Sequence, residues 1–290
     1  MFQTKITEMF GIKYPIVVGT MMFLARAEIV AAASNAGALG VLGSAMFQSK
    51  EEFRQEIKKL KGMTAKPFAV NLNLFPMRTP VDNREFMEVI YEEGIRIVET
   101  SGHKAPEDLA IVVGYENGGA TGTLDVTTLC LVPRVVDALK VPVIGGGGVT
   151  DGRGFLALLA LGAQGVIIGT ATLIAEECPI HPKLKQALIE ATELDTMVIM
   201  RSIQNSHRAW ANEAARKVAE LEKQQAGLEA IVQTAGGDKV RRMYQEGDIQ
   251  AGVISCGQGV GLVKKVMPMK DIIEGIVYQA DNLRKKLGGI

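Results

Sequence analysis

Short apolar, β-branched runs alternate with longer amphipathic segments through the first 175 residues, and this alternation restricts the fold more than any other feature. Apolar runs without polar alternation are typical of parallel strands buried on both faces. Their starts recur about every 25 to 30 residues, close to the repeat of an eight-fold βα barrel. The expected strands are 15–19, 38–43, 67–71, 95–100, 110–115, 141–145 and 165–169, with helices such as 26–36, 50–61, 84–93 and 151–161 between them.

The interval between the fourth and fifth expected strands breaks this rhythm. Only residues 101–109 connect them, whereas a parallel crossover needs about a dozen residues or more and usually a helix. We therefore predict an α/β fold of the TIM (β/α)8 type that is one βα unit short. The missing unit would fall near Leu109 and Ala110, either deleted from the gene or only absent from the resolved chain.

The sequence changes character after Ala175, where Ala, Glu, Lys and Arg become frequent. Helices are expected at 182–191, 206–225, 229–232 and 238–245, with glycine breaks between the later ones, and a last helix at 270–287. We predict a barrel domain formed by residues 1–195 and 265–290. Residues 196–264 would form a second, helical domain that acts as a lid or substrate domain.

Composition excludes several classes of partner. Lys plus Arg and Asp plus Glu number 32 each, so no net field attracts nucleic acid or an anionic membrane. The chain shows neither a signal-peptide pattern nor the roughly 18 uninterrupted apolar residues of a membrane helix. The three cysteines form no CxxC pair, which is typical of a reducing cytoplasm. We expect a soluble, cytoplasmic protein with a small-molecule substrate, and a homodimer is left open.

Glycines end the last two expected strands, at Gly146, Gly147 and Gly148 and at Gly169, which Thr170 follows. Barrel enzymes often bind phosphate after strands seven and eight. Glycine lets backbone N–H groups approach an anion closely. A tight turn alone would explain one such loop, but two adjacent loops favour a phosphate site.

The other strand ends carry small residues, amides and methionines instead of metal ligands. They offer no cluster of histidines and carboxylates with metal spacing, which argues against a metal-dependent hydrolase. A flat aromatic cofactor would find backbone donors and apolar walls there. The residues concerned are Gly19-Thr20-Met21-Met22, Asn71, Glu99-Thr100-Ser101 and Glu116-Asn117-Gly118-Gly119.

An ordered series of motifs over nearly the whole chain resembles the nitronate monooxygenases, formerly called 2-nitropropane dioxygenases. Relatives of that family include FMN-dependent NADH:quinone reductases and FabK-type enoyl reductases. The series includes Gly19-Thr20-Met21, Pro67-Phe68-Ala69-Val70-Asn71, Glu116-Asn117-Gly118-Gly119, Asp151-Gly152-Arg153-Gly154, Gly169-Thr170, Cys178-Pro179-Ile180-His181 and Ser255-Cys256-Gly257-Gln258.

The resemblance implies a TIM barrel, a helical second domain and one non-covalent FMN. It implies phosphate binding by the glycine loops, contact with the isoalloxazine through Met21, Met22 and Asn71, and Gln258 facing the cofactor from the second domain. The full set of residues expected at the FMN is Gly19, Thr20, Met21, Met22, Asn71, Gly118, Gly119, Gly146, Gly147, Gly148, Gly169, Thr170 and Gln258.

The sequence departs from the family at two places. Family members usually carry a histidine base after the glycine pair, where this chain has Ala120, and alanine cannot accept a proton. The short interval near Leu109 falls where the family's fifth strand usually brings a lysine close to the flavin. The catalytic residue is therefore unknown, with His103 and Glu116 as candidates.

Four functions remain open after this comparison of motifs. Oxidation of alkyl nitronates with oxygen ranks first by resemblance. Reduction of quinones or enoyl thioesters with NAD(P)H as co-substrate ranks second and close behind, because Ala120 in place of the usual histidine weakens the case for nitronate oxidation. A non-redox barrel that binds a sugar phosphate would share the glycine loops, and an inactive flavin-binding subunit would suit the short crossover.

Overall fold

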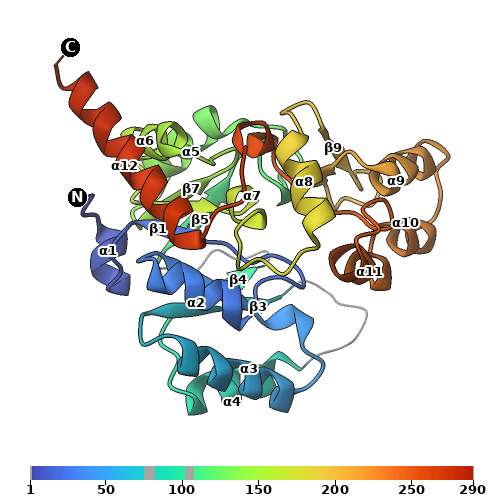
Figure 1. Ribbon diagram of the computed structural model, residues 1–290, viewed down its shortest axis with the longest axis horizontal. Coiled ribbons are helices and arrows are strands. Elements are labelled where there is room, and N and C mark those ends of the chain that lie inside the picture. Colours follow the sequence, from blue (N-terminus) through green and yellow to red (C-terminus); the bar gives the residue numbers. More distant parts are fainter. Residues whose placement is uncertain (1, 75–81, 102–107, 290) are drawn as a thin grey trace.

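A sheet of seven parallel strands forms the centre of the computed structural model, which describes residues 2–74, 82–101 and 108–289 (Figure 1). Neighbouring strands follow the order β4-β3-β2-β1-β8-β7-β5, and each pair is parallel. All seven predicted strands are confirmed. They are β1 (Ile16–Val18), β2 (Leu39–Gly43), β3 (Phe68–Asn73), β4 (Val98–Ser101), β5 (Ala110–Val113), β7 (Val143–Gly146) and β8 (Gly165–Ile168).

The sheet is TIM-like but does not close within the described residues. β4 and β5 are its end strands, and no ladder joins them. Residues 102–109, which link the two strands, are too few for a crossover helix, so the prediction of a barrel one βα unit short is confirmed. A groove of about 650 Å³ beside the opening is lined in part by Leu72, Leu74, Met87 and Tyr91. These apolar side chains lie where another barrel helix would otherwise pack.

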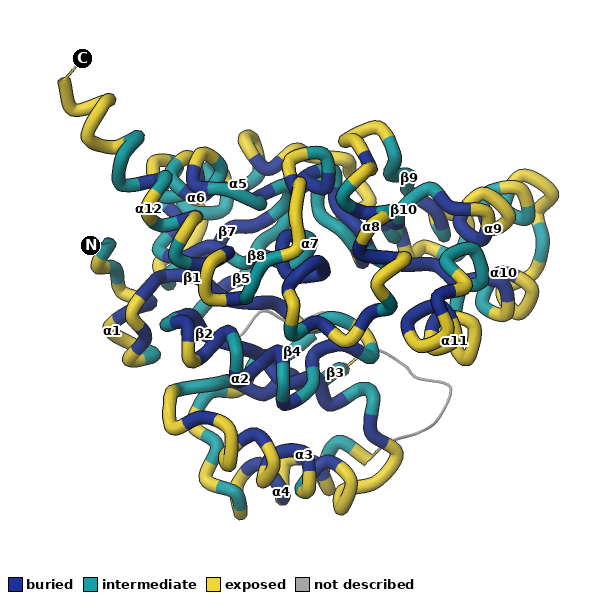
Figure 2. The backbone as a smooth tube through the Cα atoms, in the orientation of Figure 1, coloured by how far each residue is buried: buried dark blue, intermediate teal, exposed yellow. Residues whose placement is uncertain are grey.

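Helices cover the outer face of the sheet, and their apolar sides form the main core together with outward-facing strand residues such as Leu42 and Val70. The long C-terminal helix α12 packs across α6 and α2 (Figure 1). Buried backbone is concentrated along the strands and the inner sides of these helices (Figure 2). The helices of this part are α1 (Lys5–Phe10), α2 (Ala27–Asn35), η1 (Ser44–Met46), α3 (Lys50–Met63), α4 (Asn83–Glu92), α5 (Thr128–Ala138), α6 (Gly152–Ala160), α7 (Thr170–Leu173) and α12 (Met269–Leu287).

Side-chain caps fix where several of these helices begin. The Ser49 hydroxyl accepts a hydrogen bond from the N–H of Glu52 at 3.2 Å and starts α3. The Asp151 carboxylate accepts from the N–H of Arg153 at 2.9 Å and starts α6 directly after the β7 loop. Short polar side chains at this position satisfy N–H groups that have no partner in the helix.

The second part of the chain combines a small antiparallel sheet with helices, which corrects the prediction that residues 206–225 form one helix. Residues 207–210 instead form β10, because their backbone pairs with β9 and β6 and Ala209 is buried in the core of this part. Asn212 then caps α9. The elements are β6 (Gly119–Ala120), α8 (Pro182–Glu190), β9 (Thr196–Ile199), β10 (His207–Trp210), α9 (Glu213–Lys223), α10 (Leu228–Ala235), α11 (Asp238–Glu246) and η2 (Gln258–Leu262).

The limits of the second domain at residues 196 and 264 stay a prediction. Within the described ranges, no helix is both long enough and apolar enough to cross a membrane.

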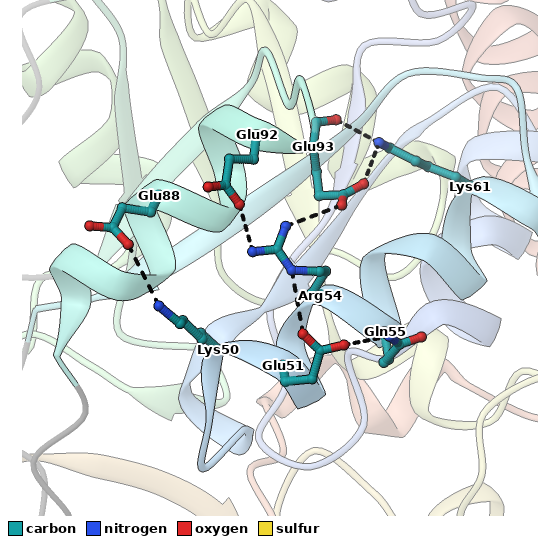
Figure 3. Close-up of polar contacts among 8 residues, drawn as sticks. All are labelled: Lys50, Glu51, Arg54, Gln55, Lys61, Glu88, Glu92 and Glu93. Carbon is teal, nitrogen blue, oxygen red and sulfur yellow. Dashed lines mark hydrogen bonds and ion pairs between the residues drawn. The ribbon is translucent and has the colours of Figure 1, made fainter.

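A network of charged side chains joins α3 to α4 (Figure 3). The Arg54 guanidinium lies 2.6 Å from Glu92 and 3.4 Å from Glu93. Lys61 lies 2.9 Å from Glu93, and Lys50 makes a longer contact of 3.9 Å with Glu88. These ion pairs hold the outermost helix in place on the open side of the sheet.

Candidate functional site

The inward-facing side chains of the sheet form layers along the strands. The lower layer is apolar and consists of Val17, Val41, Ala69, Ile97, Ile111, Ile144 and Ile167. Because side chains alternate along a strand, the next inward positions toward the C-terminal ends are Gly19, Gly43, Asn71, Glu99, Val113, Gly146 and Gly169. Asn71 and Glu99 are thus the polar side chains of a layer that is otherwise small and apolar, and a flat ligand can lie on it.

The loops after β7 and β8 form a cradle of backbone groups. Gly147 and Gly148 have φ angles of 108° and 71°, which glycine adopts readily. A Cβ on Gly147 would lie 2.4 Å from Thr128 Oγ1. Gly169 faces open space, and in the described part of the chain the N–H groups of Gly148 and Thr170 donate to no acceptor. Free N–H groups beside glycines suit an anion such as phosphate, so these residues fit the phosphate of a nucleotide cofactor.

The segment from Gly257 to Gly259 closes one side of this cradle. The N–H of Gly257 donates to Thr170 Oγ1 at 3.0 Å, and the N–H of Gln258 donates to the carbonyl of Glu116 at 3.0 Å. The approach is close, because a Cβ on Gly118 would lie 2.5 Å from the nitrogen of Gly257. The segment therefore holds the backbone of Gln258 beside Glu116 at the C-terminal end of the sheet, and the contact of Gln258 with a cofactor stays a prediction.

The segment after β1 supplies the methionine wall. Met21 packs against the main core, and the Thr172 hydroxyl lies 3.8 Å from its sulfur. Met22 is 52% exposed. An exposed methionine next to a glycine-lined floor is a soft, adaptable surface for an aromatic ring.

A hydrogen-bonded cluster around Glu99 lies on the opposite side of the mouth. Glu99 Oε2 accepts from Asn71 Nδ2 at 3.0 Å and from Thr20 Oγ1 at 3.3 Å. Asn71 Nδ2 also donates to Ser101 Oγ at 2.7 Å. Burial raises the pKa of the Glu99 carboxyl above its usual value, and the bonds from Asn71 and Thr20 only partly oppose this effect. A carboxyl whose pKa is raised by burial holds its proton at higher pH than an exposed glutamate does.

The predicted catalytic candidates are placed differently. Glu116 Oε2 accepts from the N–H and the hydroxyl of Thr128, at 2.9 and 2.7 Å, and so satisfies the start of α5. His103 lies outside the described residues. Ala120 is exposed on β6 and pairs with His207 of β10. His207 Nε2 lies 3.0 Å from Ser255 Oγ, and burial lowers the pKa of its ring to about 4.

Among the described residues, no group of three or more His, Cys, Asp or Glu side chains could hold a metal ion. The polar groups of the described mouth include backbone N–H groups, the amide of Asn71, the hydroxyls of Thr20 and Ser101, and the carboxyl of Glu99. The sequence places Glu99 at a strand end but does not predict it as a site residue. Its inward position follows from Asn71, because the two residues are partners in the β3–β4 ladder.

The family model described as nitronate monooxygenase matches this chain in two segments, residues 3–94 and 76–279. The chain belongs to the nitronate monooxygenase family. It is 30% identical to a probable nitronate monooxygenase of Staphylococcus haemolyticus over 68% of this chain and 75% of that protein. The family consists of flavin-dependent oxidoreductases, and we assign this chain to that enzyme class.

Other relatives match over almost their full length. The structure of FabK from Thermotoga maritima superposes with a TM-score of 0.89 at 30% identity, covering 100% of this chain and 99% of FabK. The (3aS,4S,5R,7aS)-5-hydroxy-7a-methyl-1-oxo-octahydro-1H-indene-4-carboxyl-CoA dehydrogenase of Rhodococcus jostii is 29% identical over 99% of this chain and 98% of its own length. That alignment spans 350 positions, whereas this chain has 290 residues. The dehydrogenase therefore has internal residues with no counterpart here.

Proposed function

We propose that this protein is an FMN-dependent oxidoreductase that exchanges hydride with NAD(P)H and a thioester-linked substrate. The observation that carries the FMN assignment is the cradle at Gly147, Gly148 and Gly169, where glycine backbone and unpaired N–H groups converge at the ends of β7 and β8. When bound, FMN supplies a carrier of two electrons.

Different residues of the mouth would contact the phosphate and the ring of this cofactor. The N–H groups of Gly148 and Thr170 would donate to its phosphate. Met21 and Met22 would form a wall beside the ring, and Asn71 would lie beneath it in the inward-facing layer. Gln258, brought in by the segment that packs on Gly118, would limit access from the second part of the chain.

The preference for hydride exchange over nitroalkane oxidation rests on Ala120. An alanine cannot deprotonate a neutral nitroalkane, and the one nearby histidine of the described mouth, His207, is bonded to Ser255. The full-length similarity to FabK and to a CoA dehydrogenase supports a thioester substrate. FabK-type enzymes are enoyl reductases, so an enoyl thioester is the form we expect.

Oxidation of nitronates is the second candidate. The family model and the staphylococcal relatives favour it, and an already ionised nitronate needs no base. The two candidates differ in what reduces the flavin, NAD(P)H in the first and the nitronate itself in the second.

Absorption spectroscopy tests the proposal in two steps. The purified protein, soaked with FMN and desalted, should keep flavin bands; a spectrum without them would reject both flavin functions and favour a sugar-phosphate barrel. Anaerobic NADH or NADPH should then bleach the bands, and crotonyl-CoA should restore them. Oxygen uptake with propionate 3-nitronate but no bleaching by either nicotinamide would replace the first candidate with the second.

A further inference from the structure

We propose that the Glu99 carboxyl contacts the flavin ring and acts as a protonation switch that sets how readily the ring accepts electrons. This inference rests on the proposed FMN binding and assigns a role to a residue that the family resemblance leaves without one. Glu99 would be a tuning residue, in contact with the cofactor, that neither attacks nor deprotonates the substrate.

The position of Glu99 carries the inference. It is the ionisable side chain of the upper inward-facing layer, whose other members are glycines, Val113 and Asn71. The Thr20 hydroxyl, which directly precedes Met21 and Met22 in the chain, lies 3.3 Å from Glu99 Oε2, so a ring whose edge lies at Met22 comes within reach of Glu99. A carboxyl at that place meets the ring directly.

The hydrogen bonds of Glu99 leave one oxygen available. Both donors, Asn71 and Thr20, bond to Oε2. Oε1 has no hydrogen-bond partner among the described residues. It is also not among the fully buried unpaired atoms, so a ligand can reach it. Oε1 can therefore donate a hydrogen bond to the ring when the carboxyl is protonated, while Oε2 stays fixed by the two donors.

Among residues 2–74, 82–101 and 108–289, no cation is paired with the Glu99 carboxyl. The neighbouring groups on β1 and β3 are the hydroxyl of Thr20 and the amide of Asn71, and β4 itself adds the hydroxyl of Ser101. Across the open sheet, β5 presents Val113. In the described part of the chain no salt bridge reaches Glu99, and burial raises the pKa of its carboxyl.

The chemical consequence follows from charge. Reduction places negative charge on a flavin ring, and charge close to the ring tunes its potential. An ionised Glu99 opposes that charge, whereas a protonated Glu99 does not and can donate to the ring. The cofactor should therefore become harder to reduce as pH rises through the pKa of Glu99, beyond the ordinary pH dependence of flavin reduction.

Glu99→Gln tests this because glutamine keeps the shape and the amide can still donate, but it cannot ionise. The midpoint potential of the FMN-loaded protein is measured over the whole pH range in which the protein stays folded, and it is compared with that of Glu56→Gln. Glu56 is a buried carboxylate on helix α3, on the outer side of the sheet, and it accepts from the N–H of Ala27 at 2.8 Å. Its variant therefore controls for the loss of a buried charge.

We expect the plot of midpoint potential against pH to bend at the pKa of Glu99 in the wild type and in Glu56→Gln. In Glu99→Gln this bend should be absent. Above the bend, Glu99→Gln should favour reduced over oxidised FMN by about tenfold more than the wild type, which is about 30 mV for a two-electron couple. Parallel curves for the wild type and Glu99→Gln would overturn the inference.

A second variant covers failure of Glu99→Gln to fold. Thr20→Val keeps the carboxyl and removes one donor whose bond lowers the pKa of Glu99, so the bend should move to higher pH; an unmoved bend would count against the inference. Carbon-13 NMR titration of the glutamate carboxyls in the cofactor-free protein gives an independent reading. A Glu99 resonance that titrates in the ordinary range would reject the inference even if FMN binds, whereas loss of FMN binding in the wild type would reject the proposed function.

Discussion

The two sides of the sheet mouth recognise a ligand by different means. On the closed side, around β7, β8 and β1, glycines remove side chains and expose backbone, and α12 packs closely on α6. On the open side, β3 and β4 offer the side chains of Asn71 and Glu99, which are hydrogen-bonded to each other, while ion pairs join the outer helices α3 and α4. Glycine loops can be recognised in a sequence, but a pair of inward-facing side chains becomes visible only when the strand register is known.

The largest effect on ligand binding at the closed side is expected from Gly147→Ala. The φ of 108° and the 2.4 Å approach to Thr128 leave no room for a methyl group, so the phosphate loop must shift. We expect FMN affinity to fall by at least about tenfold, or 1.4 kcal/mol, in a titration of FMN fluorescence.

Gly94→Ala is the matched control for that variant. Gly94 also has a positive φ, of 64°, but no atom lies within 4 Å of its would-be Cβ. Alanine there costs about 1–2 kcal/mol of backbone strain and should leave FMN affinity unchanged. Equal losses of affinity in both variants would mean that strain, and not the cradle, controls binding.

A smaller effect is expected from Gly152→Val, which tests packing on the closed side without touching the ligand. A Cβ on Gly152 would lie 2.5 Å from both Ala280 N and Ile276 O of α12. Overpacking of this kind costs about 1–3 kcal/mol, measured as a loss in the free energy of unfolding in urea. Gly275→Ala, on the same helix α12 with no neighbour within 4 Å, should instead stabilise the protein by up to about 1 kcal/mol.

The smallest effect is expected on the open side, from Glu93→Gln. Lys61 and, after it, Arg54 hold the pKa of Glu93 below its usual value of 4.5. A lowered pKa contributes stability that is present above the unfolded value and is lost as pH falls through the folded value. Glu93→Gln should therefore lower the urea midpoint slightly at pH 7 and make no difference well below pH 4.5.

Glu88→Gln checks that the effect comes from the linked network. It breaks only the exposed 3.9 Å contact with Lys50, and such pairs contribute little. If Glu88→Gln lowered the urea midpoint at pH 7 as much as Glu93→Gln, the effect would come from any charge at α4 and not from the linked network.

Sequence patterns predicted the parallel sheet, its missing unit and the glycine cradle because these depend on local signals: apolar runs, interval lengths and glycine clusters. The strand at His207 was missed because its residues lie in an Ala- and Arg-rich stretch typical of a helix, and because its partner at Gly119 of β6 is distant in sequence. Glu116 could be found as a strand-end carboxylate, but its bond to Thr128 is a tertiary contact that no spacing reveals.

The opening between β4 and β5 also has a consequence for handling the protein in solution. A closed barrel has no free strand edges, whereas here the outer edges of β4 and β5 pair with no other described strand and can pair with another chain. Val98 of β4 is 42% exposed and Tyr91 of α4 is 87% exposed beside one such edge. Concentrated samples should therefore self-associate from this side, and amide hydrogens of β4 should exchange with deuterium sooner than those of β1 or β8.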